Sequence, residues 1–589
     1  MAVEEQAPQE VAGTTSETAP LLGSAASAQG DTAAPHISKF NGNSGHGTFS
    51  RDTADPELSS GNGNTGGAKD NEPKIKVNLA QPLPALAIGI YLVAMDQTLT
   101  IATYGKMGSD LNALNNTSWI ATSYFLTLTT FQPLYGRLSD IFGRKVILSP
   151  TECLLFAYSV FGIGCLGCGL AQDIIQLCIA RGVAGMGGGG MNAVVSILVT
   201  DLVSLRDRGV WQGYINIVFG AGIASGGPIG GLLTDTIGWR WAFAGQFPIA
   251  ILAWIAVFTV LQSPPETAGG GTDHWRQKLL RIDFLGAFAL SAAAFVLLYG
   301  LDNGANEGWG RPVTVVPLTL TPVLFAVFVF VEVRVATDPF APGHVILDPP
   351  LLAAYGANFF GVAAQMGFLF FIAMFYQAAM ALTATQSGLM FVPSTVLGLT
   401  GSLGGGLVMR RTGKYYGLML AGYSILLLSI VPLVLFTGAL TKSVIGVVVG
   451  MAFLALGASI SNPRAAAITT TLIAIIANCA PEDMAIAVAC SYLFRSLGTT
   501  IGISLSTAVL QQVLCTELAA RLRDGGRAAE IEARVRESLD YIWTLPPPVA
   551  ATVRDCYAVA TTWAFLPVAL LACLCLVSTA FIREKKLDR

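Results

Sequence analysis

The ten residues Gly136-Arg-Leu-Ser-Asp140-Ile-Phe-Gly143-Arg144-Lys145 decide the fold, because they form a very short charged connection between two long apolar stretches. Each glycine allows a tight turn there. Asp140 precedes Arg144 by four residues, so the two side chains can pair along one turn of helix. The alternative is an ordinary basic cytosolic loop, since such loops are enriched in Lys and Arg. The register of glycine, acid and base favours a specific motif over that alternative.

The composition is that of a membrane protein. Apolar residues make up 53% of the 589 residues, charged residues make up 12%, and the mean hydropathy is +0.60. Soluble domains average about 25% charged residues. No Ser/His/Asp set, phosphate-binding Gly-Lys-Ser/Thr loop or metal-ligand cluster occurs, and the four histidines lie in predicted tails or loops. We therefore expect no enzymatic activity, cofactor, metal site, nucleic-acid partner or ATP hydrolysis, which leaves an ion gradient as the energy source.

Residues 1–80 are rich in Gly, Ser, Thr, Ala, Asn and Pro and nearly free of aromatic residues. Because such a segment cannot bury enough apolar surface to fold, we predict a disordered cytosolic tail without a cleavable signal peptide. The string from Glu17 to Leu21 and Leu22 resembles an acidic dileucine signal, which clathrin adaptors bind when they route membrane proteins to endosomes or the vacuole. A chance match in a disordered tail is the alternative.

Beyond residue 80, apolar stretches recur at about the 20-residue length that a helix needs to cross the hydrocarbon core. We predict fourteen spans, at about 82–103, 118–136, 146–169, 174–200, 210–233, 241–262, 283–302, 313–334, 351–378, 387–408, 415–437, 444–474, 485–511 and 557–581. The twelfth stretch is too long for one straight span, so we expect a kink at Pro463.

The basic residues predict the orientation. One set of short loops holds Arg137, Arg144, Lys145, Arg206, Arg208, Arg276, Lys278, Arg281, Arg410, Arg411 and Lys414. The opposite set holds only Lys106, Arg240, Arg311 and Lys442. The first set is therefore expected to be cytosolic, together with both termini.

Three expectations concern the opposite side of the membrane. The sequons that begin at Asn115 and Asn116 would be open to glycosylation there. The charge-balanced loop 512–556 is expected to form short amphipathic helices. Cys515 and Cys556 bracket this loop and could form a disulfide in an oxidising lumen, although most cysteines have the character of apolar packing residues.

A faint internal repeat links two halves of the chain. The segment Gly406-Leu-Val-Met-Arg-Arg-Thr-Gly413-Lys414 aligns with the segment that begins at Gly136, with glycines seven residues apart in both copies. The first copy resembles the signature loop of the major facilitator superfamily, in which the charges latch the two halves together on the cytosolic side. The resemblance implies an all-α membrane fold of two six-helix bundles, and an inserted pair of spans gives the fourteen-helix drug:proton antiporter branch.

Two charged residues inside spans are candidates for proton coupling. Asp96 lies about two thirds of the way along the first span, in a string that resembles the Leu-Asp-x-Thr motif of that branch with Met95 in place of leucine. A carboxylate there costs several kcal/mol unless it faces an aqueous cavity or a partner. Arg181 matches the Arg-x-x-x-Gly-x-Gly motif of the fourth span, in which the arginine is tied to proton transfer. For both residues the alternative is a structural bond between helices.

The fifth and sixth spans carry two further motifs. Gly226, Gly227 and Pro228 resemble the glycine-rich motif that marks antiporters, and the proline makes a hinge plausible. Gln246 and Pro248 form a Gln-x-Pro variant similar to that of fungal vacuolar basic amino acid transporters. In the ninth span, polar and aromatic residues suited to a binding site near the midplane include Asn358, Tyr376 and Gln377. Arg495 lies in a Phe-Arg-Ser-Leu-Gly string that resembles a recurring motif of the branch, and it is a further candidate for proton coupling or substrate binding.

The predicted organisation is a tail at 1–80, a first bundle at 81–262, a linker with two spans at 263–350, a second bundle at 351–582 and a cytosolic tail at 583–589. The first functional hypothesis is a proton-coupled antiporter that moves basic amino acids into a fungal vacuole, with Asp96 as an anionic partner for a cationic solute. The second is export of drugs or secondary metabolites at the plasma membrane. The third is a nutrient-sensing receptor that binds without transport.

Overall fold

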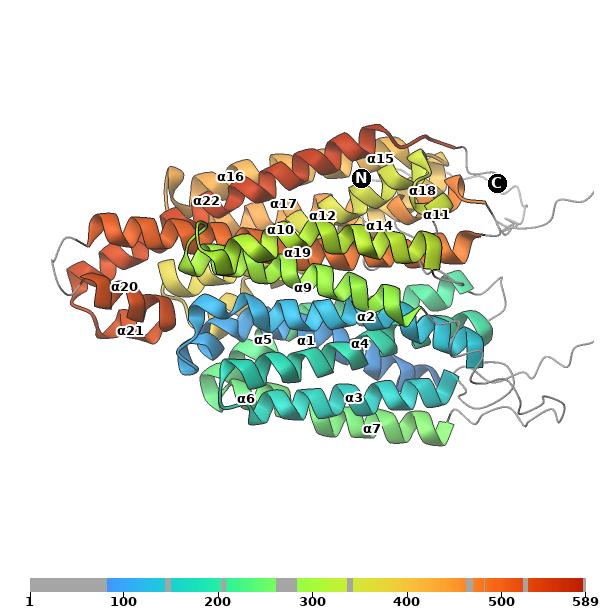
Figure 1. Cartoon of the computed structure of the whole chain (residues 1–589), viewed down its shortest axis with the longest axis horizontal. Helices are drawn as coiled ribbons and strands as arrows, with labels where there is room; N and C mark the ends of the chain where they lie inside the picture. The colour runs from blue at the N-terminus through green and yellow to red at the C-terminus, as the bar shows by residue number, and fades with distance from the viewer. Residues whose placement is uncertain are drawn as a thin grey trace, which may run out of the picture. The chain divides into compact units, whose positions relative to one another are not determined.

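The computed structural model describes residues 82–142, 150–202, 208–260, 283–335, 343–461, 470–480, 483–522 and 528–585, and every regular element in these ranges is a helix. Figure 1 shows the long helices side by side. Among the described residues, eleven helices are long and apolar enough to cross a membrane, and Val444–Ile460 is a shorter apolar helix. Helices are required because lipid offers no partners for backbone polar groups. The expectation of an all-α membrane protein is confirmed.

The first half contains seven helices and one 3₁₀ turn. They are α1 (Pro82–Asp110), η1 (Leu114–Asn116), α2 (Ser118–Phe142), α3 (Pro150–Leu170), α4 (Ile174–Leu202), α5 (Arg208–Thr236), α6 (Trp239–Ala244) and α7 (Gln246–Val260). Helix α1 packs against α5, α2 against α4, and α3 against α4 and α7. The inserted pair follows, as α9 (Phe284–Glu307), α10 (Pro312–Phe330) and the π-helical turn η2 (Val331–Val335). Helix α9 packs against α10, α2 and α19.

The second half is longer. It contains α11 (Gly343–Ile346), α12 (Pro349–Met374), η3 (Phe375–Ala379), α13 (Ala384–Leu389), α14 (Val392–Thr412), α15 (Tyr416–Leu428), α16 (Ile430–Val434), η4 (Leu435–Ala439), α17 (Val444–Ser461), α18 (Thr470–Asn478), α19 (Met484–Arg521), α20 (Ala528–Glu537), α21 (Asp540–Thr544) and α22 (Pro547–Ala580). Helix α12 packs against α19, α14 against α17, and α15 against α17. These three pairs correspond, in the same order, to the pairs α1 with α5, α2 with α4 and α3 with α4 of the first half. A duplicated six-helix unit requires this correspondence.

The glycine of the second repeat copy has a clear structural role. Gly413 follows α14 with φ of 66°, a left-handed conformation that glycine adopts without steric cost. Its N–H donates to the carbonyl of Met409 at 2.8 Å, which closes the helix. The corresponding Gly143 lies outside the described residues, and so do Arg144, Lys145 and Pro463.

Two boundaries differ from the sequence prediction. Helix α19 continues to Arg521 and α22 begins at Pro547, so the loop between these spans is shorter than 512–556. Cys515 and Cys556 therefore lie within helices, and both thiols are free. Cys515 Sγ donates to Glu532 Oε1 at 2.9 Å, and Cys556 is buried. The short helices α20 and α21 confirm the expectation of helices in this segment.

The two halves meet at one end of the bundle. We call the end at which α1 stops and α2 begins the outer end, and the opposite end the inner end; the charge bias predicts that the outer end is non-cytosolic. Near the outer end, the Tyr104 hydroxyl donates to the Phe370 carbonyl at 2.8 Å, and the two rings stack at 4.2 Å. The Thr385 N–H and hydroxyl donate to Asp235 Oδ2 at 2.8 and 2.6 Å. These bonds hold the outer end closed.

Helices α20 and α21 reinforce this closure. They belong to the second half but contact α1 of the first half. Lys106 Nζ lies 2.5 Å from Asp540 Oδ2, and the Leu539 N–H donates to Ser109 Oγ at 2.8 Å. The segment therefore ties the last turn of α1 to the second half.

Candidate functional site

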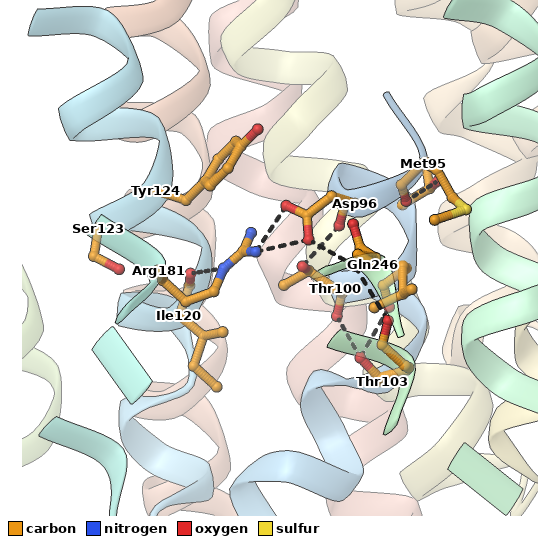
Figure 2. A network of polar contacts seen from close by, with 12 residues as sticks. Met95, Asp96, Thr100, Thr103, Ile120, Ser123, Tyr124, Arg181 and Gln246 are labelled. Carbon is orange, nitrogen blue, oxygen red and sulfur yellow. Dashed lines mark hydrogen bonds and ion pairs between the residues drawn. The ribbon is translucent and has the colours of Figure 1, made fainter. Parts of the chain in front are cut away.

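An ion pair lies buried at the centre of the first half. Arg181 Nη1 of α4 donates to both carboxylate oxygens of Asp96 on α1, at 2.9 Å and 2.7 Å (Figure 2). Asp96 is 0% exposed and Arg181 is 1% exposed. An acid within a span needs either an aqueous cavity or a charged partner. The structure gives Asp96 the charged partner. In this conformation its oxygens are occupied by Arg181 and are not presented to a cationic solute.

Other groups complete the environment of the pair. Gln246, the first residue of α7, donates from Nε2 to Asp96 Oδ1 at 3.3 Å. Arg181 Nε donates to the carbonyl of Ile120 at 3.3 Å. The guanidinium carbon lies 4.4 Å from the centroid of the Tyr124 ring, so the cation also contacts an aromatic face. Three residues that the sequence motifs indicated separately, Asp96, Arg181 and Gln246, thus form one cluster contributed by α1, α4 and α7.

Glycines of α5 position the helix that carries Asp96. A Cβ atom built on Gly226 would collide with the carbonyl oxygen of Met95, the residue before Asp96, and one on Gly222 would lie 2.7 Å from the Tyr91 carbonyl. Only residues without a Cβ allow the two backbones to approach this closely. Helix α5 runs continuously through Pro228, and Gly227 faces Gly388 across the two halves. In this structure the predicted hinge residues therefore form a packing surface.

The predicted site residues of the second half do not form one cluster. Asn358 Nδ2 donates to Ser491 Oγ at 2.8 Å and joins α12 to α19. Tyr376 is buried in η3 at the outer end, and Gln377 Nε2 donates to the carbonyl of Ala102 at 3.0 Å. Gln377 is therefore part of the outer closure. Arg495 is half-buried on α19.

The remaining predicted residues divide into two groups. Gly136 and Asp140 lie in the last turns of α2. Glu17, Leu21 and Leu22 lie outside the described residues. Asn115 and Asn116 form η1, where Asn116 Oδ1 accepts from Asn306 Nδ2 at 3.1 Å. Asn116 is thus engaged in a contact between helices.

Sequence analysis missed several residues of this arrangement. Tyr124 carries no motif, because an aromatic residue in an apolar span resembles any other packing residue. Lys106 was counted among the few basic residues outside the cytosolic set, yet its partner Asp540 could not be identified. The two residues are 434 positions apart in the chain.

Comparison with known proteins agrees with this architecture. The sequence pattern of the Major Facilitator Superfamily matches residues 86–503. The chain belongs to the major facilitator superfamily. It is therefore a secondary transporter and not an enzyme, and it is a multi-pass membrane protein.

Several relatives of the chain are fungal. The chain is 36% identical over 500 residues to Multidrug resistance protein fnx1 of Schizosaccharomyces pombe, covering 85% of this chain and 91% of the relative. It is 34% identical over 524 residues to Vacuolar membrane amino acid uptake transporter fnx2 of the same organism, covering 87% and 85%. Vacuolar basic amino acid transporter 2 of Saccharomyces cerevisiae is 28% identical over 469 residues, covering 78% and 96%.

Solved structures support the fold alone. A bacterial homologue of the human lysosomal transporter Spinster, in an inward-facing and unoccupied conformation, matches with a TM-score of 0.56 at 14% identity. The match covers 87% of this chain and 98% of the bacterial one.

Proposed function

We propose that this protein is a proton-coupled antiporter with fourteen transmembrane helices, which moves basic amino acids into the fungal vacuole in exchange for lumenal protons. The observation that carries the coupling is the buried Asp96–Arg181 pair, the kind of embedded acid and base that marks proton pathways. The substrate class and the vacuolar location rest on the printed names of two relatives at 34% and 28% identity.

The proposed coupling uses the proton affinity of Asp96. A lumenal proton that binds Asp96 neutralises the carboxylate and leaves Arg181 with the Tyr124 ring and the Ile120 carbonyl as its remaining partners. A buried cation without its counter-ion is costly, so protonation changes the relative stability of the states that alternate during transport. Release of the proton to the cytosol restores the pair. The structure, with the pair formed and the outer end closed, corresponds to the state after that release.

The predicted cytosolic motif has a complementary proposed role. The motif would hold the inner end closed when the outer end is open. Its residues are Gly136, Asp140, Gly143, Arg144 and Lys145. The hinge proposed for Gly226, Gly227 and Pro228 would let α5 move against α1 and α13 between the two states.

The test is uptake of labelled lysine into vesicles or isolated vacuoles with an acidic interior. We expect uptake that an uncoupler abolishes, with arginine and histidine as competitors. Uptake that is insensitive to the uncoupler would contradict proton coupling. Transport of a drug panel without transport of lysine would contradict the substrate class.

Export of drugs is the second candidate, because a relative at 36% identity is named a multidrug resistance protein. Localisation separates the two candidates. The vacuolar proposal expects the tagged protein at the vacuolar membrane, and Leu21→Ala with Leu22→Ala should divert it to the cell surface if the dileucine string is used. Surface localisation of the unmodified protein would favour export.

A further inference from the structure

Arg495 is an embedded cation that has no acidic partner among the residues that the structure describes. It lies within the span that covers Ile486–Arg521. None of the ion pairs among the described residues involves it. The chain segment 462–469, which precedes the neighbouring helix α18, contains no Asp or Glu. Arg181, an embedded cation of the first half, is neutralised by Asp96 instead.

The side chain lies on a different face of α19 from those that contact α12 and the helices α9 and α10. Ser491, Phe494 and Gly498 face α12, where they contact Asn358, Tyr355 and Phe359. Leu493 and Leu497 pack against the inserted helices α9 and α10.

Successive residues of a helix are rotated by about 100° around its axis. Arg495 comes four residues after Ser491, so it points about 40° away from Ser491, on the side opposite Leu497. Tyr492 shares this gap between the two contact faces and is 40% exposed. Arg495 is itself half-buried, so part of its side chain is accessible.

Two phenols, Tyr492 on α19 and Tyr423 on α15, lie close enough to act electrostatically on Arg495. Tyr423 is 1% exposed, and its hydroxyl lies 3.3 Å from Thr471 Oγ1 of α18. Neutral phenols do not compensate the charge of a guanidinium. A cation within a span that lacks an internal counter-ion marks a site for an anionic group.

We propose that Arg495 binds the carboxylate group of the transported amino acid. The assignment rests on the proposed function, because it takes an amino acid as the substrate. The planar fork of guanidinium donors matches the two oxygens of a carboxylate, and charge-assisted bonds of this kind are among the strongest in proteins. The first half contains a charge-assisted pair of the same two groups, in which Arg181 Nη1 donates to both oxygens of Asp96 at 2.7 and 2.9 Å. The substrate carboxylate would give Arg495 the partner that Asp96 gives Arg181.

The experiment measures ligand binding by the purified full-length protein as a rise in its melting temperature. The probes are lysine, lysinamide, in which a neutral amide replaces the carboxylate, and cadaverine, which lacks the group. For the unmodified protein, we expect the concentration of lysine that gives half of the maximal rise to be at least about tenfold lower than that of either analogue. The difference corresponds to the one charge-assisted hydrogen bond that the analogues cannot form.

Variants assign the effect to Arg495. Arg495→Gln should remove the preference for lysine over lysinamide, and Arg495→Lys should retain part of it. Arg521→Gln is the matched control, because Arg521 lies on the same helix, is 41% exposed and pairs only with Glu517 among the described residues. Size-exclusion chromatography checks that each variant is folded.

Two results would overturn the assignment. One is an undiminished preference for lysine in Arg495→Gln, and the other is equal binding of lysine and lysinamide by the unmodified protein. A failure of the proposed function has a different signature, because no amino acid would then raise the melting temperature of the unmodified protein. That result would remove the carboxylate ligand and with it the role of Arg495.

Discussion

Replacement of Asp96 by asparagine tests both the stability and the function of the buried pair. Both carboxylate oxygens bind Arg181, and neither residue is more than 1% exposed. Removing one partner of a buried ion pair costs about 3–5 kcal/mol, because the other charge remains without compensation. The Tyr124 ring at 4.4 Å and the Ile120 carbonyl still contact Arg181. We therefore expect a loss near the lower limit, about 3 kcal/mol.

The stability assay is thermal unfolding of the purified protein in detergent. A loss of about 3 kcal/mol should lower the melting temperature of a chain of this size by about 3 °C. The double variant Asp96→Asn with Arg181→Gln has no buried charge at this site, so it should recover most of the loss. The reasoning is refuted if Asp96→Asn melts at the temperature of the parent, or if the double variant is less stable than either single variant.

The transport assay separates coupling from binding. An asparagine cannot take up and release a proton at this position, so uncoupler-sensitive accumulation of lysine should be lost in Asp96→Asn. Exchange of labelled for unlabelled lysine across the membrane needs no net proton movement and should continue. Normal proton-driven accumulation by the variant would exclude Asp96 from coupling.

The two ends of the bundle offer further tests. Asp540→Asn removes the ion pair to Lys106. Because both side chains are more than 40% exposed, the pair should stabilise the closed outer end by only about 0.2–1 kcal/mol. Its loss should make the labelling of a cysteine buried at the outer end up to about fivefold faster. An unchanged rate would show that this pair does not stabilise the closed outer end. Gly231→Val would place a side chain against the backbone of α13 and should impair transport. Gly404→Val is the control and should not impair it, because a Cβ at Gly404 meets nothing within 4 Å. Equal transport by both variants would contradict a functional role for the close contact between α5 and α13. Asp140→Ala should raise the labelling rate of single cysteines at the inner end without changing substrate affinity, and reduced affinity with an equal rate would move Asp140 into the binding site.

Much of the fold could be predicted because membrane insertion depends on local properties of the chain. A run of about 20 apolar residues needs a helix wherever it lies, since lipid provides no hydrogen-bond partner. Each of the fourteen predicted stretches overlaps at least one observed helix, and eleven helices of the described residues meet the criteria of length and hydropathy for a span. The ends of α19 and α22 were harder to predict, because these helices extend beyond the membrane-length apolar run and pack on protein there.

The sequence by itself determined that Asp96, Arg181 and Gln246 are unusual residues, because a charge or an amide within a span is costly wherever it lies. Only the tertiary structure decided that they share one site, since they are 85 and 150 positions apart in the chain. Which side chain meets which depends on the rotation and the spacing of whole helices, and these follow from contacts such as that of Gly226 with the backbone of α1. The same geometry gave Asp96 its counter-ion, whereas Arg495 has none among the described residues. The hydropathy of a span cannot distinguish these two outcomes, because it sums residues along one helix, whereas an ion pair depends on the packing between helices.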